Sequence, residues 1–424
     1  MAAKTVYVHL GLPKTGTTYI QSALWESRDR LASAGCLVPG DKRVSTWLAA
    51  CDFMGRRPQG ADAPAVAGSW SGFVEAIGRW DGDRVILSQE LLGNATRRQA
   101  QRMAKSLRPC DVHVVLTVRD LGRTLPSLWQ QEIRKGRTWT WGEFVAAVRD
   151  PESGPATAGV AFWLRFDVQR VLQTWDGVIP PSNIHVVIVP PPGAPADALL
   201  GRFAEATGVD RLALTCQQPG GANAAVGMAE AEVLRRLNVG LAGKLNERQY
   251  ARAVVQPIVP VLQERTSSSR GRLPVEHRSW VAEQSEALVD FLQRQPYHVV
   301  GDLTDLAPRS DADSGPDPDG LDEAQLAEPM MQALVAVCAT YGKFWWQARR
   351  REDMSSADAS TRFASRARVL GYQARRSVLE RADSNALFGR LARAYLRRSA
   401  SGASAGFRNK GTNAAASGRT SRED

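Results

Sequence analysis

The sequence contains no long apolar run. No stretch of its 424 residues approaches the roughly 18 consecutive apolar residues of a membrane-spanning helix. The first residues, MAAKTVYVHLG, have no apolar segment followed by a small-residue cleavage site, so we expect the protein to stay in the cytoplasm. A composition of 43% hydrophobic and 23% charged residues is typical of a globular protein.

Cysteine is also scarce, and no C-x-x-C pair occurs. The five cysteines are odd in number and far apart in the chain, at Cys36, Cys51, Cys110, Cys216 and Cys338. This spacing does not match the ligand patterns of zinc or redox sites. We therefore expect reduced thiols, mostly in the core.

Positive charge is concentrated at one end of the chain. The formal net charge is +10, and residues 341–424 alone hold 18 Lys and Arg against 7 Asp and Glu. The rest of the chain is close to neutral. Because the net positive charge belongs to the tail, we do not expect nucleic acid as a partner, and the hypothesis of a nucleic-acid or membrane-surface binding protein rests on the tail alone.

Four β-branched, apolar segments indicate buried strands: 4–11, 83–90, 111–120 and 183–190. Helical patterns lie between them, notably at 17–34 and 121–135. Strands that alternate with helices favour a parallel sheet covered on both faces. The expected fold class is α/β, a P-loop NTPase-like three-layer sandwich with a central parallel sheet.

Beyond residue 195 the strand signals fade and helical periodicity dominates. Val233, Leu234, Leu237 and Leu241, for example, share one helix face. This predicts a helical second half of the domain, with helices at 196–207, 225–240, 245–264 and 277–294.

The segment PRSDADSGPDPDG, with four Asp among Pro, Gly and Ser, reads as a linker. We therefore divide the chain into a catalytic domain at 1–307, an acidic linker at 308–322, a basic helical extension at 323–398 and a disordered tail at 399–424. The arginine-rich helix could lie on an anionic membrane surface or contact a partner. The alternative is a solvated helix face with a flexible end.

The segment GLPKTGTT, at 11–18, follows the first predicted strand and precedes a helix. A glycine-bearing loop in this position directs backbone N–H groups and a helix N-terminus at a phosphate. The nucleotide-hydrolysing version, G-x-x-x-x-G-K-[ST], has its lysine directly after the second glycine. Here Gly11 and Gly16 have the right spacing, but Thr17 takes the lysine position and Lys14 lies inside the loop.

These residues resemble the sulfotransferases that use 3'-phosphoadenosine-5'-phosphosulfate (PAPS), whose 5'-phosphosulfate loop reads P-K-[ST]-G-T-T. The match is complete over Pro13, Lys14, Thr15, Gly16, Thr17 and Thr18. The resemblance implies that the loop holds the 5'-phosphate and that Lys14 contacts the oxygen bridging phosphate and sulfate. It also places Tyr19 against the adenine, whereas a buried helix aromatic is the alternative.

The same family binds the 3'-phosphate with an arginine at a strand end and a serine eight residues later. VVLTVRDLGRTLPSLWQQ supplies Arg119 and Ser127 at this spacing. Arginine is a permanently charged, bidentate donor suited to phosphate. Alternatively, Arg119 pairs with Asp120 and Ser127 is an ordinary helix residue. Asp120 could also be the magnesium-binding acid of a kinase or NTPase.

Sulfuryl transfer needs a base for the acceptor proton and no metal in this scheme. By resemblance the base is a His or Glu near a strand between the two motifs, which selects Glu90 at the end of RVILSQELL. The alternative is that Ser88 caps a helix and Glu90 is a first-turn acid. The histidines are weaker candidates, and His9 is the one nearest the loop.

The sequence thus predicts a PAPS-dependent sulfotransferase acting on a hydroxyl or amine of a small-molecule or glycan acceptor, such as a carbohydrate or glycolipid. The alternative is a Mg-dependent P-loop kinase or NTPase.

GANAAVGMAEAEVLRRLN (221–238) looks like a segment of bacterial, particularly actinobacterial, sulfotransferase-like proteins. Arg270 and Arg272 flank Gly271 much as in the family's late 3'-phosphate loop, or belong to a surface loop. The oligomeric state is not predicted.

Overall fold

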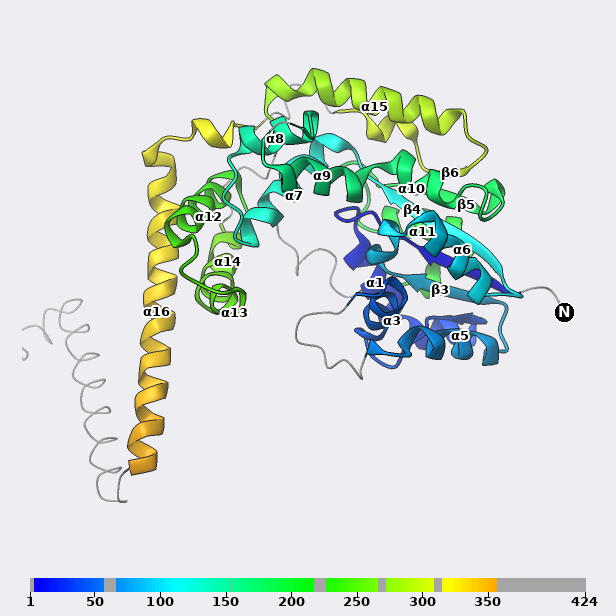
Figure 1. The fold of residues 1–424 in the computed structure, drawn as a ribbon, viewed down its shortest axis with the longest axis horizontal. Coiled ribbons are helices and arrows are strands. Elements are labelled where there is room, and N and C mark those ends of the chain that lie inside the picture. Colours follow the sequence, from blue (N-terminus) through cyan, green and yellow to red (C-terminus); the bar gives the residue numbers. More distant parts are fainter. Residues whose placement is uncertain are drawn as a thin grey trace, which may run out of the picture. The chain divides into compact units, whose positions relative to one another are not determined.

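A six-stranded parallel sheet forms the centre of the structure (Figure 1). The computed structural model describes residues 4–56, 66–152, 154–216, 226–265, 272–308 and 315–356. The strand order is β2-β3-β1-β4-β5-β6, and every neighbouring pair is parallel. The strands are β1 Thr5–His9, β2 Cys36–Leu37, β3 Arg84–Ser88, β4 Asp111–Val118, β5 Ile184–Ile188 and β6 His298–Val300. The four predicted strands are confirmed.

The two edge strands β2 and β6 were not predicted from the sequence. They contain only two and three residues, which is too short for an apolar period to be recognised. Each pairs with one neighbour only, β2 with β3 and β6 with β5. The expectation that strands end near residue 195 was therefore wrong for β6.

Helices cover both faces of the sheet, which confirms the three-layer α/β sandwich. On β4, Val114 and Leu116 face one core while Val115 faces the other, as expected for a strand buried on both sides. The core with Val115 contains α1 Thr17–Glu26, α2 Arg28–Ser33 and α11 Ala198–Thr207. The opposite core contains α3 Ser45–Met54, α5 Ser69–Arg79, α6 Arg97–Ser106, α10 Val168–Trp175 and part of α15 Arg278–Gln293.

A third core combines helices of the predicted second half with three helices that precede it in the chain. Trp129, Trp141, Phe144 and Phe162 are fully buried there. Val233 and Leu234 pack into the same core, with Leu237 and Leu241 partly buried against it. The helices are α7 Leu121–Arg134, α8 Trp141–Arg149, α9 Ala156–Phe166, α12 Met228–Leu241, α13 Glu247–Tyr250, a π-helical turn Ala251–Val255 and α14 Gln256–Gln263.

The described part of the predicted linker is packed against the helical half. The carboxylate of Asp319 accepts hydrogen bonds from the backbone N–H groups of Trp141 (2.9 Å) and Gly142 (2.7 Å). Leu321 and Leu326 are buried in the third core. The first compact unit accordingly runs Met1–Cys338, beyond the expected end at residue 307, and the second is Ala339–Asp424.

Helix α16, Glu323–Ser356, crosses this division. Residues 357–424, which include most of the predicted basic extension and tail, lie outside the described residues. Residues 221–225, Arg270 and Gly271 lie outside them as well. Over the described part of the chain, no helix is long and apolar enough to cross a membrane.

None of the five cysteines forms a disulfide. Cys36 and Cys51 are buried, Cys110 and Cys216 are half-buried, and Cys338 is exposed. The expectation of core thiols therefore holds for two of the five positions.

Three histidines form a row across β4, β5 and β6, near the ends where these strands begin. His113 Nδ1 lies 2.8 Å from His185 Nε2, and His185 Nδ1 lies 3.0 Å from His298 Nδ1. His113 Nε2 is 3.1 Å from Asp111 Oδ2. Burial, and then repulsion from His113 and His298, lowers the pKa of His185 to about 4. His185 is therefore neutral in the folded protein at pH 7.

From the low pKa of His185 we predict that the free energy of unfolding decreases at acidic pH. An unfolded histidine has a pKa of about 6.5, so below that pH the unfolded state binds a proton that folded His185 does not. Its contribution to the free energy of unfolding is complete above pH 6.5 and falls by about 2 kcal/mol at pH 5. Urea denaturation at pH 7 and pH 5 measures this loss, and His185→Gln should reduce it. An unchanged pH dependence in the variant would contradict the assignment.

Candidate active site

The loop GLPKTGTT leaves the carboxyl end of β1 and leads directly into α1. Gly11, Lys14 and Gly16 have positive φ angles of 84°, 66° and 85°. Gly16 is the N-cap of α1, and a Cβ added there would lie 2.4 Å from Leu199 Cδ2. Glycine is thus needed at this position for both its backbone angle and its contact. In the first turn of α1 the Tyr19 N–H donates to the Gly16 carbonyl at 3.0 Å, which leaves the N–H groups of Thr17 and Thr18 as the candidates for binding an anion.

A buried hydrogen-bond network supports the loop from below. His9 lies 2.8 Å from Ser88 Oγ and 3.2 Å from Thr117 Oγ1. Thr117 Oγ1 lies 2.5 Å from Thr15 Oγ1. The Thr15 hydroxyl donates a hydrogen bond to the Leu12 carbonyl. His9 is fully buried, and burial lowers its pKa to about 3. His9 is therefore neutral, and its position is that of a structural support beneath the loop.

Lys14 adopts the left-handed conformation that only glycine reaches without strain. Its carbonyl accepts a hydrogen bond of 3.0 Å from Arg119 Nη1. Burial, and then repulsion from Arg119 and Arg134, lowers the pKa of the Lys14 amine to about 8, whereas Glu90 acts in the opposite direction. An anion bound beside Lys14 would offset this repulsion and raise the pKa of the amine again.

Arg119 lies at the end of β4 and joins the two sequence motifs. Its Nε atom is buried and has no hydrogen-bond partner among the described residues. Burial, and then repulsion from Arg123, lowers the pKa of Arg119 to about 10. A buried guanidinium with an unused N–H donor lowers the stability of the folded protein unless a bound anion accepts a hydrogen bond from it.

Asp120 does not pair with Arg119. Its carboxylate caps α7 by accepting from the Arg123 backbone N–H at 2.8 Å and from Arg123 Nε. Arg123 also donates to the Pro190 carbonyl at 3.0 Å. This role was missed from the sequence, although an aspartate directly before a helical pattern is a typical N-cap. The Asp120 carboxylate is thus bonded to the first turn of α7.

The other predicted donor-site residues differ in exposure. Thr15 and Thr17 are buried, Thr18 is exposed, and Pro13 is half-buried. Tyr19 is half-buried against the core that contains α11, and its hydroxyl donates to the Ala196 carbonyl at 3.3 Å.

Ser127 is half-buried on α7, the helix that begins directly after Arg119 and Asp120. The two residues of the predicted 3'-phosphate motif are therefore carried by one strand end and the helix that follows it.

Glu90 lies over the loop. It begins a short 3₁₀ helix, η1 Glu90–Asn94. A Cβ atom added at Gly11 would lie 3.1 Å from Glu90 Cγ, so the two residues are in close contact. Its carboxylate accepts a hydrogen bond from the Thr17 hydroxyl. Burial raises the pKa of Glu90, and the Thr17 bond and the charge of Lys14 oppose this rise. Ser88 is not the cap of this turn: the cap is Gln89, and Ser88 bonds to His9.

Two cavities flank the loop. One of about 260 Å³ is lined by Thr15 and Arg119, and by Trp163, Phe166 and Leu288 from α9 and α15. Another of about 190 Å³ is lined by residues of the α1 start and the β3 end, among them Thr18, Gln21, Ser88 and Gln89, and by Arg43. The contributions of α9 and α15 were not predicted, because nothing in their local sequence relates them to the loop.

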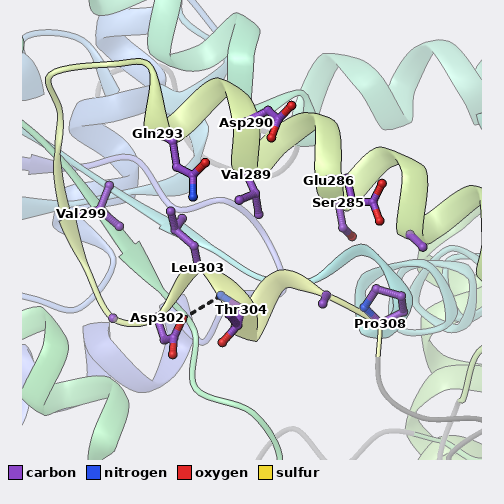
Figure 2. A pocket seen from close by; sticks show the side chains of 13 residues that line it. Ser285, Glu286, Val289, Asp290, Gln293, Val299, Asp302, Leu303, Thr304 and Pro308 are labelled. Carbon is purple, nitrogen blue, oxygen red and sulfur yellow. Dashed lines mark hydrogen bonds between the residues drawn. The ribbon is translucent and has the colours of Figure 1, made fainter.

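A third pocket, of about 770 Å³, lies apart from these residues between α15 and η7 Leu303–Leu306 (Figure 2). It carries the carboxyl groups of Glu286, Asp290 and Asp302. None of the predicted site residues lines it. Over the described ranges, no group of three or more His, Cys, Asp or Glu side chains is placed to hold a metal ion.

The geometry around the loop suits a ligand with negative groups at two points. The loop amides and Lys14 form one cationic region, and the free donor of Arg119 forms another. A carboxylate, Glu90, lies beside the first region. The arrangement can therefore bind an anion and place a proton acceptor next to it.

Comparisons with known proteins add little to these observations. No family model and no curated protein match the sequence. Among solved structures, the chain is similar to the sulfotransferase from Alicyclobacillus acidocaldarius, with a TM-score of 0.34 and 13% sequence identity over 57% of this chain and 94% of that chain. Values this low carry no functional inference, so the residues of the site alone support the proposal that follows.

Proposed function

We propose that this chain is a sulfotransferase that moves the sulfuryl group of PAPS to a hydroxyl or amine of an acceptor. The observation that carries the proposal is the contact between Arg119 and the Lys14 carbonyl, which brings the two motifs of the resemblance together. The buried, unpartnered Arg119 Nε supports it, because a 3'-phosphate would supply the missing acceptor.

In this proposal the loop holds the 5'-phosphosulfate through its backbone. The hydroxyl of Thr15 is already engaged with Leu12 and Thr117, so Thr15 contributes its N–H group rather than its side chain. Thr18 is exposed and has its hydroxyl available. Lys14 stabilises the negative charge that develops on the departing phosphate oxygen. Arg119 and Ser127 select the 3'-phosphate, and Tyr19 lies toward the adenine.

Glu90 takes the acceptor proton. Its carboxylate lies beside Lys14 and Thr17, which is where an acceptor hydroxyl must approach the sulfur in line with the breaking S–O bond. Burial raises its pKa, which makes it a stronger base than an exposed glutamate. PAPS, as co-substrate, supplies the reactive sulfuryl group, and the scheme needs no metal.

The alternative, a Mg-dependent kinase or NTPase, has less support from these residues. Asp120, the candidate magnesium ligand, is bonded to Arg123 and caps α7. Thr17 takes the place of the NTPase lysine and bonds to Glu90.

Nucleotide binding tests the proposal directly. We expect 3',5'-ADP, the desulfated product, to raise the free energy of unfolding by about 2.7 kcal/mol at 100 times its Kd. ADP, ATP and Mg·ATP at the same concentration should stabilise the protein much less. Thermal unfolding with each nucleotide measures the difference. Equal stabilisation by 3',5'-ADP and 5'-ADP would refute the proposed donor, and a preference for Mg·ATP would favour the kinase.

Replacement of Arg119 tests its role in selecting the 3'-phosphate. Loss of a charge-assisted hydrogen bond costs about 1.5–3 kcal/mol, so Arg119→Ala should weaken 3',5'-ADP binding by roughly 10- to 100-fold. Binding of 5'-ADP should fall by a smaller factor, because this nucleotide loses only the support that Arg119 gives to the loop through the Lys14 carbonyl. Calorimetric titration gives both constants. Arg79→Ala is the matched control, because Arg79 is exposed and pairs only with Glu75 on the surface. Equal losses for both nucleotides in Arg119→Ala would point to a structural role instead.

The base assignment predicts a pH effect. Glu90 must be ionised to accept a proton, so turnover should fall as the pH drops through its raised pKa. Glu90→Gln should reduce kcat by roughly 100-fold or more and leave 3',5'-ADP binding intact. Thr17→Val removes a hydrogen bond that lowers the pKa of Glu90, so it should move the acid limb to higher pH. Full turnover in Glu90→Gln, with Glu75→Gln as control, would show that Glu90 is not the base.

A further inference from the structure

Helix α7 is buried on most of its surface but keeps one open polar stripe. Nine of its 14 residues are buried. Arg123, Ser127, Gln131 and Arg134 are not, and their spacing of four, four and three residues places them on one side of the helix. The stripe begins beside Arg119 and runs past Ser127 to the last turn. It therefore starts at the proposed donor site and continues beyond it.

Two of the three basic groups near this stripe already have partners. Arg123 is bonded to Asp120 and to the Pro190 carbonyl. Lys135, the residue after α7, pairs with Glu132 at 2.9 Å. Arg134 differs, because it makes no hydrogen bond or ion pair with any residue that the structure describes.

The isolation of Arg134 is unusual within this chain. It is half-buried, and burial lowers the pKa of its guanidinium. Other partly buried arginines in the described ranges either pair with a carboxylate, as do Arg123, Arg165, Arg202, Arg235 and Arg265, or donate to a backbone carbonyl, as do Arg84, Arg119 and Arg170. Partial burial of an unpaired charge is unfavourable, so a site that keeps one is suited to an anion from outside the chain.

Arg134 lies close enough to Lys14 to act on its charge. Repulsion from Arg134 is one of the causes that lower the pKa of Lys14, after burial and Arg119. Along the helix, Arg134 is seven residues beyond Ser127, a rise of about 10 Å. It therefore lies on the last turn of α7, further along the open stripe than the proposed 3'-phosphate residue Ser127.

We propose that Arg134 binds an anionic group of the acceptor, so that the acceptor class is a hydroxyl- or amine-bearing molecule that also carries a carboxylate, phosphate or sulfate. The inference rests on the proposed sulfotransferase function and narrows its substrate class. Arginine suits this task, because its planar fork can hold two oxygens of such a group at once. The acceptor anion would compensate the charge that the protein leaves unpaired.

Phenyl β-D-glucuronide and phenyl β-D-glucoside form a suitable probe pair, because they differ by one carboxylate. Their binding is measured by calorimetry on the protein saturated with 3',5'-ADP. We expect the glucuronide to bind roughly tenfold or more tightly than the glucoside in the unchanged protein. Arg134→Gln should remove this preference, and Arg134→Lys should keep part of it. Lys135→Gln, which removes the neighbouring charge, should behave like the unchanged protein.

Donor binding separates this inference from its alternatives. Arg134→Gln should leave the Kd values of both 3',5'-ADP and PAPS within about twofold. Loss of PAPS affinity alone would assign Arg134 to the donor sulfuryl group and overturn the inference. Absence of a glucuronide preference in the unchanged protein, or an equal effect of Arg134→Gln and Lys135→Gln, would also overturn it. Failure of the proposed function would instead show as no preference for 3',5'-ADP in the unchanged protein.

Discussion

The hydrogen bond from Arg119 to the Lys14 carbonyl connects the ends of two neighbouring strands. Lys14 has a positive φ angle in this arrangement. Arg119 Nε, on the same side chain, has no hydrogen-bond partner among the described residues. The buried row of His9, Thr117 and Thr15 beneath the loop keeps this geometry in place. The loop and the end of β4 are thus joined by hydrogen bonds, and the proposed chemistry depends on the geometry that these bonds hold.

Charge balance explains how the site is arranged around this unit. Asp120 pairs with Arg123, and Glu132 pairs with Lys135, so both acids have cationic partners other than Lys14 and Arg119. Glu90 is the carboxylate that acts on Lys14, and burial raises its own pKa. The result is a partly desolvated cationic region with a proton acceptor at its border. Such a region costs stability in the free protein and gives a strong interaction with an anion.

Much of the fold could be predicted because its signals are local. The four central strands are continuous apolar runs, and the loop motif lies within eight residues. The short edge strands β2 and β6 gave no such signal, since they depend on pairing with a strand far away in sequence. Asp120 illustrates another limit: the sequence suggested an ion pair with Arg119 or a magnesium ligand, whereas in the structure Asp120 caps α7.

The sequence by itself determined the α/β class and the position of the glycine-bearing loop between β1 and α1, because apolar periodicity and loop chemistry act between near neighbours in the chain. Only the tertiary structure decided which side chains meet at that loop. Arg119 reaches Lys14 across 105 residues and Thr17 reaches Glu90 across 73. The open stripe of α7 is also a tertiary property, as is the lack of a partner for Arg134 among the described residues, because both depend on which distant segments pack around the helix.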